Sequence, residues 1–130
     1  MQDDLGKLIL RVTVGGLLIL HGMHKLLNGI EPIQAMVTAH NMPAALAYGV
    51  YLGEIVGPAM VILGLFSRLG GALIVVNMLM AVALAGMGQI LALNPMGGYA
   101  LELEAFFLFG GLSVMLLGAG RYSIGGGRWN

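Results

Sequence analysis

An almost unbroken apolar stretch, residues 8–27 (LILRVTVGGLLILHGMHKLL), constrains this chain more than any other feature. A helix of about 20 residues rises about 30 Å, which is the thickness of the hydrocarbon core of a bilayer. The stretch nevertheless carries four ionisable side chains, Arg11, His21, His24 and Lys25. An ionisable group inside a membrane is costly unless it finds a partner. The stretch therefore predicts a membrane-spanning helix that forms one wall of a bundle, and not a simple anchor.

One narrow stripe of this helix collects small and cationic residues at about 100° per residue. The stripe consists of Arg11, Gly15, Leu18, Gly22 and Lys25. Its two glycines would let a neighbouring helix approach closely. His21 lies at the edge of the stripe, whereas His24 points roughly the other way. The stripe thus predicts a packed helix face that carries a cation, Lys25, and an imidazole, His21, near one end of the helix.

The composition indicates that the whole chain is a membrane protein. Of its 130 residues, 58% are hydrophobic and only 9% are charged, whereas a soluble domain carries about 25% charge. The net charge of zero gives no indication of nucleic-acid binding, and the absence of cysteine excludes disulfides and thiol chemistry carried by this chain. We therefore predict a single all-α integral membrane domain over residues 1–130, with its first span retained and not cleaved as a signal peptide.

Three further apolar stretches complete a predicted bundle of four transmembrane helices. The spans are expected at about 8–27, 46–66, 69–93 and 99–119. The second span carries three glycines at four-residue spacing, a pattern typical of close helix packing: Gly49, Gly53 and Gly57. Its Pro58 is expected to kink the helix, because proline removes a backbone donor.

The connections and the third span carry weaker signals. Residues 32–40 place apolar side chains at helical spacing, which predicts a short interfacial helix, with an irregular loop as the alternative. Asn77 shares a stripe with small residues, so we expect it to face another helix, where amides usually serve as structural hydrogen-bonding groups. The second and fourth spans end similarly, in VILGLFSRLGG and VMLLGAGRYSIGG, which suggests a duplicated two-helix hairpin.

In the fourth span, Glu102 and Glu104 lie about 200° apart and cannot share a face. Glu104 aligns with two glycines, so we expect it to point inward, and Glu102 to meet headgroups, a loop or a neighbouring subunit. The C-terminal tail is expected to be short and flexible.

Basic residues concentrate on one side of the predicted bundle. Five of the six lie on the side of the termini: Lys7, Arg11, Arg68, Arg121 and Arg128. The positive-inside rule then predicts that both termini are cytoplasmic, in a bacterial inner membrane. We interpret Arg11 and Arg68, near that boundary, as snorkelling anchors.

Depth estimates at about 1.5 Å per residue place one polar layer in the outer leaflet. Its members are His21, Lys25, Glu54, Gln89 and Glu104, with Tyr51, Asn77 and Tyr99 as secondary candidates nearby. Ionisable groups inside a bundle are candidates for ligand binding or proton handling, and a His–Glu pair can pass protons near neutral pH. The alternative is that Lys25–Glu54 and His21–Glu104 are ion pairs that only fix helix register. No span carries the Glu-x-x-His motif of bundle di-metal sites, so we predict no metal centre.

Four pieces of the sequence carry a resemblance that spans nearly the whole chain. They are LRVTVGGLLILHGMHKL, NMPAALAY, LGEIVGPAMVILGLFSRLGG and the closing GAGRYSIG. In these pieces the chain resembles the DoxX family of small four-helix membrane proteins. The resemblance implies that fold, and active positions at Gly22, Lys25, Glu54 and Arg68. The family takes its name from a subunit associated with a thiosulfate:quinone oxidoreductase, and other members are described as partners of membrane-linked redox systems. Without cysteine, thiosulfate chemistry would need another subunit.

Three functions follow as hypotheses. The first is a subunit or accessory of a quinone-linked membrane oxidoreductase, with quinone as a possible ligand and a redox protein as partner. The second is a transporter or channel for a small or proton-linked solute, which would use the same polar layer. The third is a non-catalytic module for membrane assembly. The glycine ladder of the second span also predicts a homo-oligomer.

Overall fold

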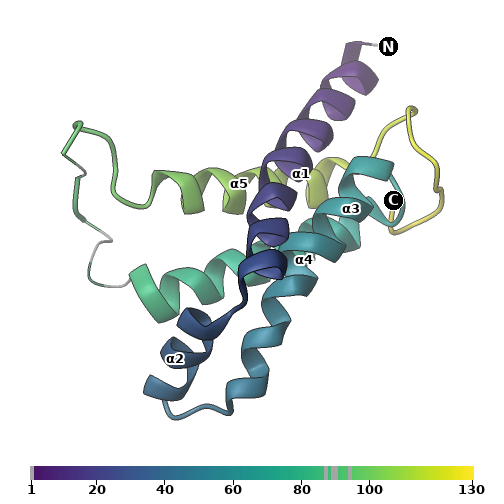
Figure 1. The fold of residues 1–130 in the computed structure, drawn as a ribbon. Coiled ribbons are helices and arrows are strands. Elements are labelled where there is room, and N and C mark those ends of the chain that lie inside the picture. Colours follow the sequence, from purple (N-terminus) through teal and green to yellow (C-terminus); the bar gives the residue numbers. More distant parts are fainter. Residues whose placement is uncertain (1, 87, 89–90, 94) are drawn as a thin grey trace.

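The computed structural model describes residues 2–86, 88, 91–93 and 95–130. Every regular element in that described part is helical (Figure 1), which confirms the all-α prediction. In chain order the elements are α1 (Gln2–Asn28), α2 (Glu31–Ala39), the 3₁₀ helix η1 (Ala44–Gly49), the π-helical turn η2 (Leu52–Val56), α3 (Gly57–Leu63), α4 (Ser67–Ala81), the π-helical turn η3 (Val82–Gly86) and α5 (Glu102–Leu117).

Three helical segments are long and apolar enough to cross a bilayer: Gln2–Asn28, Ala44–Leu63 and Ser67–Leu84. The protein is therefore a multi-pass membrane protein. α5 has 16 residues and is about 24 Å long, which is short of the roughly 30 Å of a hydrocarbon core. Helix length alone thus supports three spans, and a fourth needs a separate argument.

α1 begins six residues before the apolar stretch that predicted it. Asp3 and Asp4 lie in its first turn, where negative charge stabilises the exposed N–H groups and the dipole of a helix. Its buried positions are Arg11, Val14, Gly15, Leu18 and Gly22. They confirm four of the five residues of the predicted packing stripe, whereas the fifth, Lys25, is half-buried.

The second span changes its helical form where Pro58 interrupts the hydrogen-bond ladder. Pro58 has no N–H group, and the segment just before it is the π-helical turn η2, in which the Gly57 N–H donates to the Leu52 carbonyl. Two glycines of the predicted ladder pack against α4: a Cβ on Gly53 would overlap Asn77, and a Cβ on Gly57 would lie 3.0 Å from the carbonyl of Gly70. Gly49 has no such neighbour within 4 Å.

The hydrophobic core lies where α1, α3, α4 and α5 meet. Its buried members are Val14, Leu18, Val61, Ile74, Met78, Phe107 and Val114. A smaller cluster forms around Ile30, Val37 and Ala47, where α2 packs against η1. The segment between the first two spans is therefore a helix, as predicted, and the irregular-loop alternative is excluded. In Figure 1, α2 lies at the end of the molecule away from both termini.

The C-terminal tail is hydrogen-bonded, which corrects the expectation of a flexible segment. It folds against the turn that joins α3 to α4. The Ile124 N–H donates to the Leu63 carbonyl at 3.1 Å, and the Arg68 N–H donates to the Trp129 carbonyl at 2.9 Å. The tail therefore closes the end of the bundle at which α3 and α5 terminate.

Candidate functional site

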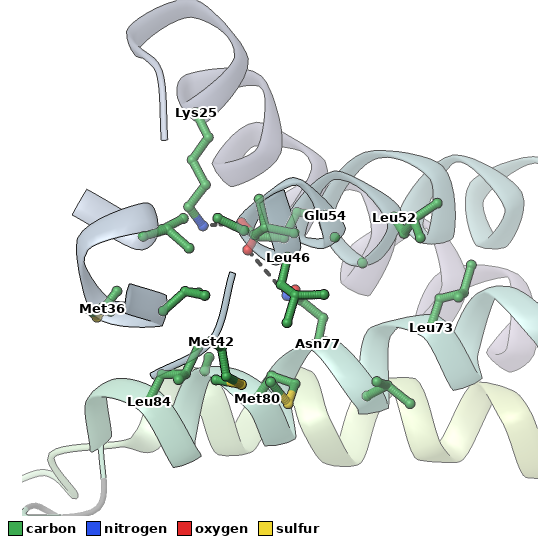
Figure 2. A pocket seen from close by; sticks show the side chains of 18 residues that line it. Lys25, Met36, Met42, Leu46, Leu52, Glu54, Leu73, Asn77, Met80 and Leu84 are labelled. Carbon is green, nitrogen blue, oxygen red and sulfur yellow. Dashed lines mark hydrogen bonds and ion pairs between the residues drawn. The ribbon is translucent and has the colours of Figure 1, made fainter. Parts of the chain in front are cut away.

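A charged cluster joins three helical elements at the end of the bundle near α2. Lys25 of α1 places its Nζ 2.5 Å from Oε1 of Glu54, which lies in η2. Asn77 of α4 donates through Nδ2 to the other carboxylate oxygen at 3.2 Å. Figure 2 shows Lys25 and Asn77 reaching Glu54 from opposite sides. Glu54 is only 4% exposed, so both oxygens of a buried carboxylate hold a partner.

Two glycines make this convergence possible. A Cβ on Gly22 would overlap the backbone carbonyl of Glu54, and a Cβ on Gly53 would overlap Asn77. α1 and α4 can therefore both approach η2 at van der Waals distance only because these positions lack side chains. Tyr51, which lies on the same span as Glu54, donates from its hydroxyl to the Lys25 carbonyl at 3.4 Å.

The cluster forms the polar end of a cavity of about 420 Å³. Residues of α2, the connection from α2 to η1, the second span, α4 and η3 form the remaining walls. These walls are apolar and include three methionines: Met36, Met42 and Met80. A volume of this size lies within the usual range for small-molecule pockets, about 300–1,000 Å³, and an apolar wall with few polar groups is their usual lining. The arrangement can bind a mainly apolar molecule and orient it through its polar atoms.

One border of the cavity lies on the outer surface of two candidate spans. Four lining side chains there are between 43% and 58% exposed: Leu46, Leu52, Val76 and Met80. They belong to the segments Ala44–Leu63 and Ser67–Leu84. The cavity is therefore bordered by apolar surface of the kind that faces lipid.

The other predicted site residues lie elsewhere. His21 packs edge-on against Phe107 of α5, with ring centroids 5.6 Å apart, and does not line the cavity. The expected His21–Glu104 pair does not form, since Lys25–Glu54 is the one ion pair among the residues that the structure describes. Glu104 is half-buried and Glu102 exposed. Depth along a helix, on which the grouping rested, carries no information on the direction in which each side chain faces.

The structure describes one of the two remaining candidates. Tyr99 is half-buried and lines a second hollow, which lies between α1 and α5 and also contains Glu102. Gln89 lies outside the described residues. Within the described ranges, no group of three His, Asp or Glu side chains is placed to hold a metal ion.

Arg11 is not a snorkelling anchor, because its side chain is buried to 1% exposure inside the bundle. Its Nε donates to the Val61 carbonyl at 3.0 Å, and its Nη2 donates to the Ile62 carbonyl at 3.3 Å. Nη1 donates to the carbonyls of Ala119 and Tyr122, and Nη2 donates to Tyr122 as well. The last carbonyls of a helix have no partner within it and attract cations. Arg11 therefore ties the end of α3 to the tail.

Arg68 has the same kind of role, which also corrects its interpretation as an anchor. Its Nη1 donates to the carbonyls of Met115 and Leu116, at 3.1 and 2.9 Å, near the end of α5. The helical stripe already placed Arg11 on a packed face, and the family resemblance singled out Arg68. The acceptors of the two side chains could not be predicted, because they are backbone atoms that every residue carries.

A family model described as DoxX matches residues 6–87, well over half of the chain, and this range contains Lys25, Glu54 and Asn77. Neither the curated proteins nor the solved structures gave a match.

Proposed function

The chain belongs to the DoxX family, and from that premise we propose that it is a membrane subunit or accessory of a quinone-linked redox system. The quinone head group would bind in the cavity beside Lys25. The observation that carries this proposal is the cavity itself, in which apolar walls end at a single cluster of hydrogen-bonding groups. A quinone has the complementary form, because its ring is apolar and its two carbonyl oxygens accept hydrogen bonds. The redox chemistry belongs to the quinone, and the protein positions it.

Lys25 supplies the donor that such a ligand needs. An ammonium carries three N–H donors, and Glu54 accepts one of them. Because the Lys25 side chain lines the cavity, the other donors are available to a carbonyl oxygen that enters it. Lys25 would then orient the ring while the methionines and aliphatic side chains pack against its faces.

Access from the bilayer supports a lipophilic ligand. The exposed border of the cavity, formed by Leu46, Leu52, Val76 and Met80, faces the region that lipid tails occupy around a membrane bundle. A quinone dissolved in the membrane could reach Lys25 through this border without crossing an aqueous phase.

The same proposal includes a fourth span and an orientation. The Arg121 N–H donates to Oδ1 of Asp4 at 3.0 Å, so the start of α1 and the segment after α5 lie together. A chain whose two ends meet on one side crosses the membrane an even number of times, which makes α5 and its flanking residues a fourth crossing. With the basic residues gathered at this end, we place both termini in the cytoplasm of a bacterial cell, beneath its inner membrane.

Quinone binding to the protein in lipid nanodiscs tests the proposal. Equilibrium dialysis with menadione, a neutral naphthoquinone, is expected to show saturable binding to the wild type. Lys25→Met should weaken it at least about tenfold, the value of one hydrogen bond to a charged group. Lys7→Met is the matched control, because it removes the same charge from the same helix at the other end. Wild-type protein without saturable binding overturns the proposal, and solute flux in proteoliposomes would then favour a transporter.

A redox partner protein and a homo-oligomer complete the proposal. Co-purification of an oxidoreductase subunit in mild detergent, together with a native mass above that of one chain, is the expected result. A strictly monomeric mass in both detergent and nanodiscs would contradict the oligomer.

A further inference from the structure

The charges that line the cavity cancel one another. Lys25 and Glu54 are the only charged side chains among its described lining residues, and they form an ion pair at 2.5 Å. Asn77, which is neutral, holds the second carboxylate oxygen. The polar end of the cavity is therefore a cation whose counter-ion is already built into the protein.

We infer that Glu54 sets the charge selectivity of this site, so that the cavity accepts uncharged ligands with a hydrogen-bond acceptor and rejects anions. The inference rests on the proposed function and names the ligand class of the same site. A neutral ligand can accept a hydrogen bond from Lys25 while the ion pair stays intact. An anion has to share Lys25 with a carboxylate that is only 4% exposed.

The cost of admitting an anion comes from the burial of Glu54. If the anion displaces Glu54 from Lys25, a buried carboxylate loses its cationic partner, which is among the most unfavourable changes in a protein interior. If Glu54 stays, two negative charges face each other across a small apolar cavity. Either way the built-in carboxylate acts against anionic ligands, a form of selectivity by repulsion. Carboxylates and sulfonates are therefore excluded even though a lysine lines the cavity.

A purely structural counter-ion would behave differently when it is removed. If Glu54 only holds α1 and the second span in register, Glu54→Gln should change the affinity for neutral and anionic ligands in the same direction. If Glu54 sets selectivity, the same substitution leaves Lys25 uncompensated and should raise the affinity for anions while that for neutral ligands does not rise. An affinity that rises for the anionic ligand and not for the neutral one therefore distinguishes a role of Glu54 in selectivity from a purely structural role.

The experiment compares menadione with a naphthoquinone sulfonate, its anionic analogue, by equilibrium dialysis against nanodiscs at neutral pH. Wild-type protein should bind menadione and not the sulfonate. Glu54→Gln should raise the affinity for the sulfonate at least about tenfold, the value of one charge-assisted hydrogen bond. The double variant Lys25→Met with Glu54→Gln should lose that gain, because no cation remains. Lys25→Met alone should gain affinity for an aminoalkyl naphthoquinone, which is cationic.

The outcomes distinguish this inference from the proposed function. Absence of menadione binding to the wild type overturns the proposed function and the inference with it. Wild-type protein that binds menadione and the sulfonate equally overturns the inference alone. So does a folded Glu54→Gln variant that binds menadione but shows no gain for the sulfonate. If Glu54→Gln does not fold, the Lys25→Met arm decides, and equal binding of the cationic analogue by variant and wild type overturns the inference.

Discussion

Each end of the bundle holds a basic side chain of α1, fully buried at one end and partly exposed at the other, and the two have different partners. Arg11 and Lys25 lie on the same stripe of the same helix, about two α-helical repeats of seven residues apart. Arg11 meets only backbone carbonyls. Lys25 meets a carboxylate and lines a cavity. Arg11 is 1% exposed and the Lys25 side chain is 29% exposed, so the two residues share their charge and differ in burial and in partners.

The number of N–H donors left on Arg11 and on Lys25 shows which of them can still bind a ligand. A guanidinium has five N–H donors, and Arg11 makes five hydrogen bonds to backbone carbonyls. No donor remains for a ligand, so Arg11 stabilises the fold. Lys25 has three donors and gives one to Glu54. Lys25, a half-buried basic residue that lines a cavity and has donors left, is the better candidate for binding.

Removal of Arg11 should produce the largest effect. Arg11→Met would leave the carbonyls of Val61, Ile62, Ala119 and Tyr122 without their donor inside the bundle. Two of these hydrogen bonds are buried, those to Val61 and Ala119, so at about 1–3 kcal/mol for each the loss of stability should reach about 2–6 kcal/mol. Thermal unfolding in mild detergent, followed by circular dichroism, measures it. Arg11→Lys should recover only part, because an ammonium has fewer donors without the planar fork. An Arg11→Met variant as stable as the wild type would break the comparison.

Glycine substitutions at the Lys25 end should have the next largest effect. Gly22→Ala would place a methyl group against the Glu54 carbonyl, so α1 must move away from η2 and Lys25 with it. Such overpacking costs about 1–3 kcal/mol. Gly16→Ala is the matched control on the same helix, since a Cβ there would meet no atom within 4 Å. Unfolding temperature and menadione affinity should both fall for Gly22→Ala and stay unchanged for Gly16→Ala. Equal behaviour of the two variants would contradict the close approach.

Some features of the fold and of the candidate site could be predicted from the sequence, and others could not. The buried stripe of α1 was predicted correctly, because helical periodicity alone determines which residues share a face. The Lys25–Glu54 pair was predicted as one of two pairs on the basis of depth. The second pair fails because His21 faces Phe107 of α5, and depth carries no information on direction.

The cavity and the contacts of the arginine side chains could not be predicted from the sequence, for a physical reason. The wall that α2 supplies depends on how a connecting segment packs, through contacts such as that of Val37 with Ala47. Arg11 depends on carbonyls from segments far apart in the chain. Such carbonyls leave no pattern in the sequence, because every residue has one.

The predicted duplication of the hairpin gains a physical basis from the two arginines. Arg11 donates to the carbonyls three and two residues before Gly64, and Arg68 to those three and two residues before Gly118. Both glycines have positive φ angles, 71° and 81°, which favour glycine. The similar span endings therefore correspond to two helix ends that are held in the same way by an arginine from the preceding helix of each hairpin.

Glu54→Gln should change stability less than either substitution above. The amide can keep a hydrogen bond to Asn77, and Lys25, whose side chain is 29% exposed, stays partly accessible at the mouth of the cavity without its counter-ion. The expected loss is about 1–2 kcal/mol, the value of one hydrogen bond to a charged group. Function should nevertheless be lost, as measured by complementation of a strain that lacks the gene, alongside thermal unfolding. A folded and fully complementing variant would show that the pair only fixes helix register.

The smallest effect on stability is expected from two cysteine substitutions that test whether the two ends lie on opposite faces of the membrane. Glu31 is the first residue of α2 at the Lys25 end, Arg128 lies in the tail at the Arg11 end, and both are exposed. Because the chain has no cysteine of its own, each variant carries a single reactive thiol. Exposed substitutions of this kind change stability by less than about 0.5 kcal/mol.

A membrane-impermeant maleimide should label Glu31→Cys in intact cells, and Arg128→Cys only after the membrane is permeabilised. This result follows from four crossings with the basic residues on the cytoplasmic side. The reverse pattern would keep the two ends on opposite faces and invert the orientation, so that the cavity would open toward the inner leaflet. Labelling of both thiols from the same side would contradict the comparison itself. Residue 31 and the tail would then lie on the same side of the membrane. The four crossings inferred from the Asp4–Arg121 contact, which put them on opposite sides, would be wrong.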